Sequence, residues 1–507
     1  MGGLQNCWID LPSLPSRTSA ILKSCHSAMS MSDICQLTAV EMAKLIRVKE
    51  LSAREVLAAH LDRIDRLNPT VNAIVTRVVE QAVKCAAAAD EAQARGDAIG
   101  PLHGLPVAHK DLQLTKGIRT TFGSPIFKDF VPAEDALLVQ RMRQNGAIAV
   151  GKTNTPEFGA GSQTFNQVFG ATLNPYDVTK TCGGSSGGAA VALACGMVAL
   201  ADGSDMGGSL RNPASFCNIV GLRPSPGRVP TWPALRGWST LSVDGPMGRT
   251  VADVALLLSA IAGLDARSPI SLGEPGARFA SSLERDFAGV RVAWWTDLGG
   301  LPVDRRVRAV VDAQRPTFEA IGCRVDEAEP DFSDADAMFK TLRAYAFVTG
   351  LGPVAAEHRD FVKDTILWEI DRGQRLTAQE IGWADLKQTE LYHRMRVFME
   401  RYEFFVLPTV QVPPFDVTQP YVTEIEGVAM ETYIDWMKSC YYISVTGHPA
   451  ISVPAGFTGD GLPIGIQIVG RHQDDWGVLQ IGHAFEQARG GSRGSAALKG
   501  PRYEWLV

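Results

Sequence analysis

The sequence predicts an α/β fold in which a large, mixed, mostly parallel central sheet is sandwiched by helices. Helical and extended patterns alternate along most of the chain, as is typical of helices packed on both faces of such a sheet. No internal repeat and no long linker divides the chain, so we expect one large domain. Its 507 residues, 45% of them hydrophobic, are enough to bury a substantial core.

The first expected elements are two helices with clear N-terminal signals. Thr38 with Glu41, and Ser52 with Glu55, have the spacing of capping boxes. Helices are expected at 39–48, 53–67, 79–95, 137–144, 189–195, 252–261, 305–321 and 477–487. Short apolar runs predict strands leading into 109–111 and at 147–150, 197–200, 290–294, 404–407, 451–453 and 464–468.

Charge and apolar patterning argue against two classes of partner. The formal net charge is −6, whereas a nucleic-acid-binding protein needs a concentrated basic face. The longest run of small apolar residues, 187–201, is too short and too rich in glycine to span a bilayer. We therefore expect neither nucleic acid nor membrane as a partner.

Cysteine usage and the N-terminal segment indicate a cytoplasmic protein. Nine scattered cysteines, an odd number without any Cys-x-x-Cys pair, are typical of reduced thiols. No His/Cys cluster supports a zinc site, so no metal and no cofactor are expected. Residues 1–31 lack the continuous apolar core of a signal peptide. We expect a poorly ordered extension at 1–31 and a single domain at 32–507.

Two loops in which serine is embedded in glycine are the strongest chemical signal. They read Cys-Gly-Gly-Ser-Ser-Gly-Gly at 182–188 and Gly-Ser-Asp-Met-Gly-Gly-Ser at 203–209. Glycine costs conformational entropy, but it lets backbone N–H groups converge on an oxyanion or a phosphate. Neither the P-loop nor the Rossmann spacing is present. Acyl transfer by a serine nucleophile is the remaining interpretation.

The residues alone allow two kinds of general base for such a serine, a histidine or a lysine. Residues 183–187 match Gly-x-Ser-x-Gly, which would make Ser185 the nucleophile of a Ser-His-Asp hydrolase. The downstream histidines available to it are His358, His393, His448, His472 and His483. The other base is a lysine, Lys110 or Lys152, each at the end of an apolar strand. It must be neutral near pH 7, down from a pKa of about 10.4, and burial can cause such a change.

The glycine-rich stretch resembles the signature of the amidase signature family. The likeness continues through Leu-Arg-Asn-Pro-Ala and Gly-Leu-Arg-Pro-Ser-Pro-Gly-Arg-Val-Pro, and upstream through His-Gly-Leu-Pro-Val-Ala-His-Lys-Asp at 103–111. It also includes Gly-His-Pro-Ala-Ile-Ser-Val-Pro at 447–454. The resemblance implies a signature core at 110–230 and a variable substrate-pocket region at 270–440.

The resemblance also implies a Ser–cisSer–Lys triad on the amidase signature fold. Ser209 matches the nucleophile, Ser185 the bridging serine that follows a cis peptide, and Lys110 the base, while Lys152 lies outside the triad. The backbone amides that would form the oxyanion hole are those of Met206, Gly207, Gly208 and Ser209. Gly159 and Ser186 are expected to contact substrate, and Asp205 and Arg211 to support the nucleophile from behind.

The function implied is a serine amidohydrolase that cleaves C–N bonds through an acyl-enzyme. The expected substrates are small, mostly neutral and apolar amides (aryl amides, anilides, carbamates or primary amides), with esterase side activity. Such a small molecule is the main partner expected, and a homodimer is the one self-association considered.

The alternative functions are the catalytic subunit of a glutaminyl-tRNA amidotransferase, a non-enzymatic scaffold, and the Ser-His-Asp hydrolase. Aromatic residues expected to be mostly core, with two or three at the substrate channel, are Trp294, Trp295, Trp368, Trp383, Trp436, Tyr441 and Tyr442.

Overall fold

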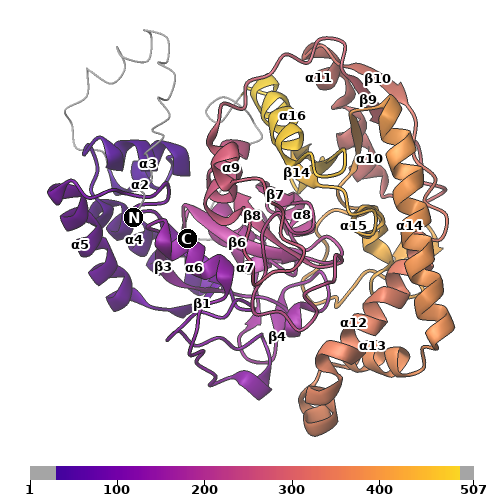
Figure 1. Ribbon diagram of the computed structural model, residues 1–507, viewed down its shortest axis with the longest axis horizontal. Coiled ribbons are helices and arrows are strands. Elements are labelled where there is room, and N and C mark those ends of the chain that lie inside the picture. The colour runs from indigo at the N-terminus through magenta and orange to yellow at the C-terminus, as the bar shows by residue number, and fades with distance from the viewer. Residues whose placement is uncertain (1–29, 491–507) are drawn as a thin grey trace.

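One 11-stranded sheet runs through the computed structural model, which describes residues 30–490 (Figure 1). The strands lie in the order β1 (Ile74–Arg77), β3 (Ile148–Thr153), β2 (Pro106–Lys110), β6 (Leu200–Asp205), β8 (Val243–Gly248), β7 (Val220–Arg223), β14 (Ala450–Phe457), β15 (Pro463–Gly470), β11 (Phe404–Pro408), β9 (Arg291–Trp294) and β10 (Arg324–Glu327). Two further ribbons pair β4 (Phe165–Asn166) with β5 (Gly170–Ala171) and β12 (Glu424–Ile425) with β13 (Val428–Ala429). The expected large mixed sheet is confirmed.

The expectation that this sheet is mostly parallel is wrong. Four neighbouring pairs are parallel, and six are antiparallel. Antiparallel strands need only a short connection, and β14 is joined to β15 by residues 458–462 alone. Alternating helical and extended patterns record the type of each element but not the direction in which strands pair.

Helices surround the sheet, and several begin and end where the sequence predicts. They are α2 (Met31–Ile34), α3 (Ala39–Arg47), α4 (Ala53–Val71), α5 (Val79–Arg95), α6 (Leu137–Gln144), α7 (Gly187–Ala194), α8 (Arg211–Phe216), α9 (Val251–Ile261), α10 (Arg305–Asp312), α11 (Arg315–Ala320), α12 (Ala335–His358), α13 (Asp364–Gln374), α14 (Ala378–Arg401), α15 (Lys438–Ser444) and α16 (Asp475–Ala488). Both predicted capping boxes are formed, at Thr38 and Ser52. The helix expected at 305–321 is two helices, and the second has Pro316 in its first turn, where a proline is tolerated.

Buried side chains on both faces of the sheet make two separate cores. In β2, Val107 belongs to one apolar cluster and Ala108 to the other, and in β6 the same holds for Leu200 and Ala201. Because successive side chains of a strand point to opposite faces, helices cover the sheet on both sides. One cluster includes residues of α7 and the other residues of α9. The expected sandwich is confirmed, and β2 and β6 are neighbouring interior strands, third and fourth in the order of the sheet.

The region expected to vary with substrate contains the long helices α12, α13 and α14, which lie together along one side of the molecule (Figure 1). The expected N-terminal extension, 1–31, falls outside the described residues apart from Ser30 and Met31, which cap and begin α2. Within 30–490, no helix is both long and apolar enough to cross a membrane. No disulfide joins any two of the seven cysteines in this range.

Candidate active site

Lys110 ends strand β2 with its side-chain nitrogen among three serine hydroxyls. The side chain is fully buried, and Nζ is within hydrogen-bond distance of the hydroxyl oxygens of Ser185 (2.8 Å), Ser186 (2.9 Å) and Ser204 (3.0 Å). No described carboxylate lies within 4.0 Å of Nζ to form an ion pair. Ser204 is not among the predicted site residues. It belongs to β6, which pairs with β2, and only knowledge of that pairing could have found it.

The surroundings of Lys110 favour an uncharged amine. Burial lowers the pKa of Lys110 to about 7, although the carboxylates of Asp244, Asp205 and Asp202 act in the opposite direction. A neutral amine has two N–H donors and one lone pair. Facing three hydroxyls, it can therefore donate to two and accept a proton from the third. Such an amine is suited to act as a general base near neutral pH.

Ser185 lies at an unusual turn of the first glycine loop. The peptide bond between Gly184 and Ser185 is cis, as the family resemblance implies. The Gly184 carbonyl accepts a hydrogen bond from Ser162 Oγ at 2.6 Å. Gly159 lies against this turn, because a Cβ on it would be 3.4 Å from Ser185 Oγ and 2.9 Å from a methyl group of Leu112. Side chains larger than hydrogen are therefore disfavoured at Gly159.

Ser186 and Ser209 connect the two glycine loops. The Ser186 N–H donates to the Ser209 carbonyl at 3.2 Å. Ser186 is fully buried and its hydroxyl is bound to Lys110, so in this structure it supports the lysine rather than facing a substrate. Ser209 is half-buried, and its hydroxyl makes no hydrogen bond to any described residue. Lys110 and Ser185 are thus joined directly, whereas no hydrogen bond joins Ser185 to Ser209.

The backbone amides of the second glycine loop are not all free. The Gly208 N–H donates to Asp205 Oδ1 at 2.8 Å, while the amides of Met206, Gly207 and Ser209 find no acceptor among residues 30–490. Of the four amides expected in the oxyanion hole, three are therefore without an acceptor among the described residues, and Asp205 holds the fourth. Gly207 must be glycine, since a Cβ there would come within 2.9 Å of the Phe339 ring.

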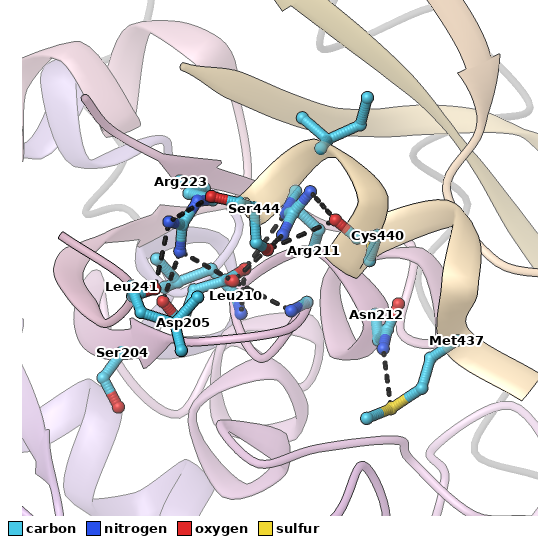
Figure 2. Close-up of polar contacts among 12 residues, drawn as sticks. Ser204, Asp205, Leu210, Arg211, Asn212, Arg223, Leu241, Met437, Cys440 and Ser444 are labelled. Carbon is cyan, nitrogen blue, oxygen red and sulfur yellow. Dashed lines mark hydrogen bonds and ion pairs between the residues drawn. The ribbon is translucent and has the colours of Figure 1, made fainter. Parts of the chain in front are cut away.

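Asp205 joins a buried cluster with two arginines behind this loop (Figure 2). Its carboxylate accepts from Arg211 at 2.9 and 3.0 Å and from Arg223 at 3.2 Å. Burial alone would raise the pKa of Asp205, but the two guanidinium groups hold it well below its usual range. The Leu210 N–H also donates to the carboxylate at 3.1 Å. The cluster thus holds the backbone on both sides of Ser209.

Comparison with known proteins identifies the family to which this chain belongs. The Amidase family model matches residues 55–479. The chain belongs to the amidase signature family. It is 36% identical to an acylamidase of Rhodococcus erythropolis over 91% of this chain and 97% of that protein. It is 34% identical to a glutamyl-tRNA(Gln) amidotransferase subunit from Moorella thermoacetica, over 90% and 97% of the two chains.

Solved structures agree with this assignment. A bacterial aryl acylamidase of the same family superposes with a TM-score of 0.84 at 29% identity, covering 89% of this chain and 96% of that one. A 6-aminohexanoate cyclic dimer hydrolase bound to its substrate gives 0.82 at 26% identity, covering 92% and 99%. This amidase is therefore an enzyme that hydrolyses C–N amide bonds.

In this amidase, Asp205→Asn should lower the free energy of unfolding by about 3–5 kcal/mol, as expected when a buried ion pair loses one partner. The substitution keeps the shape of the side chain but leaves Arg211 and Arg223 buried without a carboxylate. Thermal and denaturant unfolding would measure the change. Asp326→Asn is the matched control, because its ion pair with Arg291 is exposed and its loss should change the stability far less. Equal losses in both variants would contradict a structural role for the Asp205 cluster.

The alternative bases, the described histidines and Lys152, make no hydrogen bond to Ser185 or Ser209. No described histidine hydrogen-bonds Ser185. His448, which is buried, has its Nδ1 3.1 Å from the Thr446 carbonyl oxygen. Ser185 is therefore hydrogen-bonded to Lys110 and to no described histidine, which favours the lysine over the Ser-His-Asp interpretation. Lys152 donates to Thr115 at 2.7 Å and to the Gln113 carbonyl, and it contacts neither Ser185 nor Ser209.

Proposed function

We propose that this amidase hydrolyses small, mostly neutral and apolar amides through an acyl-enzyme, with Ser209 as nucleophile, Ser185 as proton bridge and Lys110 as base. The observation that supports this most is the hydrogen bond of 2.8 Å between Ser185 and a buried lysine that has no carboxylate partner among the described residues. A neutral amine in that position can take a proton from Ser185 and give it back.

The proposed reaction has two halves. Ser209 Oγ attacks the amide carbon while its proton passes to Ser185 Oγ and the Ser185 proton passes to Lys110 Nζ. The free amides of Met206, Gly207 and Ser209 then stabilise the oxyanion. Lys110 returns its proton through Ser185 to the departing amine, which leaves the acyl group on Ser209. Water attacks the ester by the same proton path, releasing the acid and restoring Ser209.

An apolar wall beside the serines supports the proposed substrate class. Phe158 and Met206, which flank Gly159 and the free amides, pack against a small cluster of buried residues, most of them from α12 and α13. Its members include Phe347 of α12, Ile366 of α13 and Val362 between the two helices. Aryl amides, anilides and carbamates with apolar groups suit such a wall. Esters of the same acids should also react, because an alkoxide leaves at least as readily as an amine.

A second candidate is the catalytic subunit of a glutaminyl-tRNA amidotransferase, favoured by the 34% identity to the amidotransferase subunit from Moorella thermoacetica. The hydrolase is preferred because the glutamyl-tRNA(Gln) amidotransferase subunit from Thermotoga maritima superposes with a TM-score of 0.70, below the 0.84 of the aryl acylamidase. Purification from its host with two partner proteins would favour the amidotransferase. Purification by itself, as a monomer or as the expected homodimer, would favour the hydrolase.

Labelling with a fluorophosphonate probe followed by a substrate screen tests the proposed function. Peptide mapping should place the adduct on Ser209, since the probe reacts with an activated serine. The screen would compare p-nitroanilides, primary amides, carbamates and the matching esters, with acyl chains of graded length. Failure to label, together with no turnover of any of these compounds, would overturn the proposal.

A further inference from the structure

A small cavity with one lysine lies beside the turn that carries Ser185. Gly161 and Ser162 form one wall of it, Tyr433 and Trp436 form another, and Lys363 also lines it. One wall contacts the turn that carries Ser185, because Ser162 Oγ donates to the Gly184 carbonyl at 2.6 Å. The cavity volume is about 20 Å³, which suits a group the size of one or two water molecules.

The ammonium group of Lys363 has no protein acceptor among the described residues. It makes no hydrogen bond and no ion pair with any residue from 30 to 490. Nζ lies over the ring of Phe165, 4.4 Å from the centroid, and the charge of Glu157 raises the pKa of the group. Nζ also lies 3.8 Å from where a Cβ on Gly161 would be, which places it against the cavity wall. Burial lowers the pKa of Lys363 to about 8, so the group is mostly protonated at pH 7. Lys363 is half-buried, so its ammonium group loses part of its hydration without gaining an ion pair in return.

Both carboxylates near Lys363 already accept hydrogen bonds from other groups. Glu157 accepts from the backbone N–H of Lys363 at 2.8 Å and from Ser124 at 2.7 Å. Arg343 is paired with Glu369 at 2.7 Å and also donates to Tyr433. Neither carboxylate is within 4.0 Å of Lys363 Nζ, so the cavity presents a positive group that forms no ion pair with the described residues, although the charge of Glu157 acts on it from farther away.

We infer that this cavity is a substrate subsite that binds a single carboxylate through Lys363. The preferred substrate is then an otherwise apolar amide with one acidic group at a distance from the bond that is cleaved. This inference rests on the proposed function, because it assigns a selectivity to the same active site. The carboxylate supplies the ion pair that Lys363 lacks, and Tyr433 and Trp436 restrict the group to a small one.

The test compares two pairs of substrates that differ in one carboxylate. Succinyl p-nitroanilide against pentanoyl p-nitroanilide places the acid on the acyl side. 4-Acetamidobenzoate against 4-methylacetanilide places it on the amine side. The measured quantity is the ratio of kcat/KM for the acidic compound to that for its neutral partner. In Lys363→Met this ratio should fall about tenfold in one pair, and Lys363→Arg should retain most of it. Lys84→Met, which removes an exposed lysine, should leave the ratio unchanged.

The ratio separates binding of the carboxylate from a structural role of Lys363. Loss of packing would lower kcat/KM for both members of a pair alike and leave the ratio in place. Unaltered ratios in both pairs, with turnover of the neutral anilides by the unmodified enzyme, would overturn the carboxylate subsite alone. Absence of turnover together with absence of fluorophosphonate labelling would instead overturn the proposed function, and the subsite with it.

Discussion

Ser209→Ala is expected to lower kcat about 10⁴-fold or more, the size of effect seen when a serine hydrolase loses its nucleophile. The substitution removes only the hydroxyl that makes no hydrogen bond to a described residue. It leaves the Ser209 carbonyl free to accept from Ser186 and leaves the Asp205 cluster in place. The fold should therefore survive, and the loss should appear in turnover of p-nitroanilides without a change in thermal stability.

Variants of Ser185 and Ser204 make this prediction more specific. Ser185→Ala should also lose turnover but keep the hydroxyl that reacts with a fluorophosphonate, so slow labelling of Ser209 should persist. Ser204→Ala removes one of three hydroxyls around Lys110 and should cost far less. A fluorophosphonate adduct on Ser185 in the Ser209→Ala enzyme, with turnover preserved, would contradict the assignment and make Ser185 the nucleophile.

Local signals in the sequence are sufficient for many elements and for the catalytic lysine. Helix α6 has the predicted bounds, and both capping boxes form, because their determinants lie within a few residues of one another. The position of Lys110 at the end of an apolar strand is also predictable, since burial follows from the run that precedes it. These features depend on short-range patterns that a single sequence contains.

Features that depend on long-range pairing could not be predicted. The direction of β7 and β8 is set by partners far along the chain, and the approach of Ser204 to Lys110 follows from the pairing of β6 with β2. The hydrogen bond from the Gly208 N–H to Asp205 depends on the geometry of one turn, which the glycine content alone does not specify. Lys363 lies about 200 residues from Gly161 in sequence, in a region with no recognisable motif.

The second large effect is expected at Lys110. Lys110→Arg keeps a positive charge but cannot lose a proton near neutral pH, and Lys110→Met has neither charge nor base. Both should lower kcat/KM about 10³-fold, within the usual contribution of a general base. If Lys110→Arg were to retain turnover, the lysine would be acting through its charge rather than as a base. Lys152→Met is the control, because that lysine is equally buried and should affect stability rather than the pH profile.

The pH profile of the unmodified enzyme should report Lys110 directly. Only the neutral amine accepts a proton, so kcat/KM should rise with pH and reach half its plateau near pH 7, the value to which burial lowers the pKa of Lys110. Among the carboxylates that raise this pKa, Asp244 has the largest effect. Asp244→Asn removes that charge, so the midpoint should move to lower pH, whereas Asp326→Asn on the exposed surface should not move it. Removing this charge must lower the pKa of Lys110. A midpoint that stays in place in Asp244→Asn would therefore mean that a group other than Lys110 controls the pH dependence.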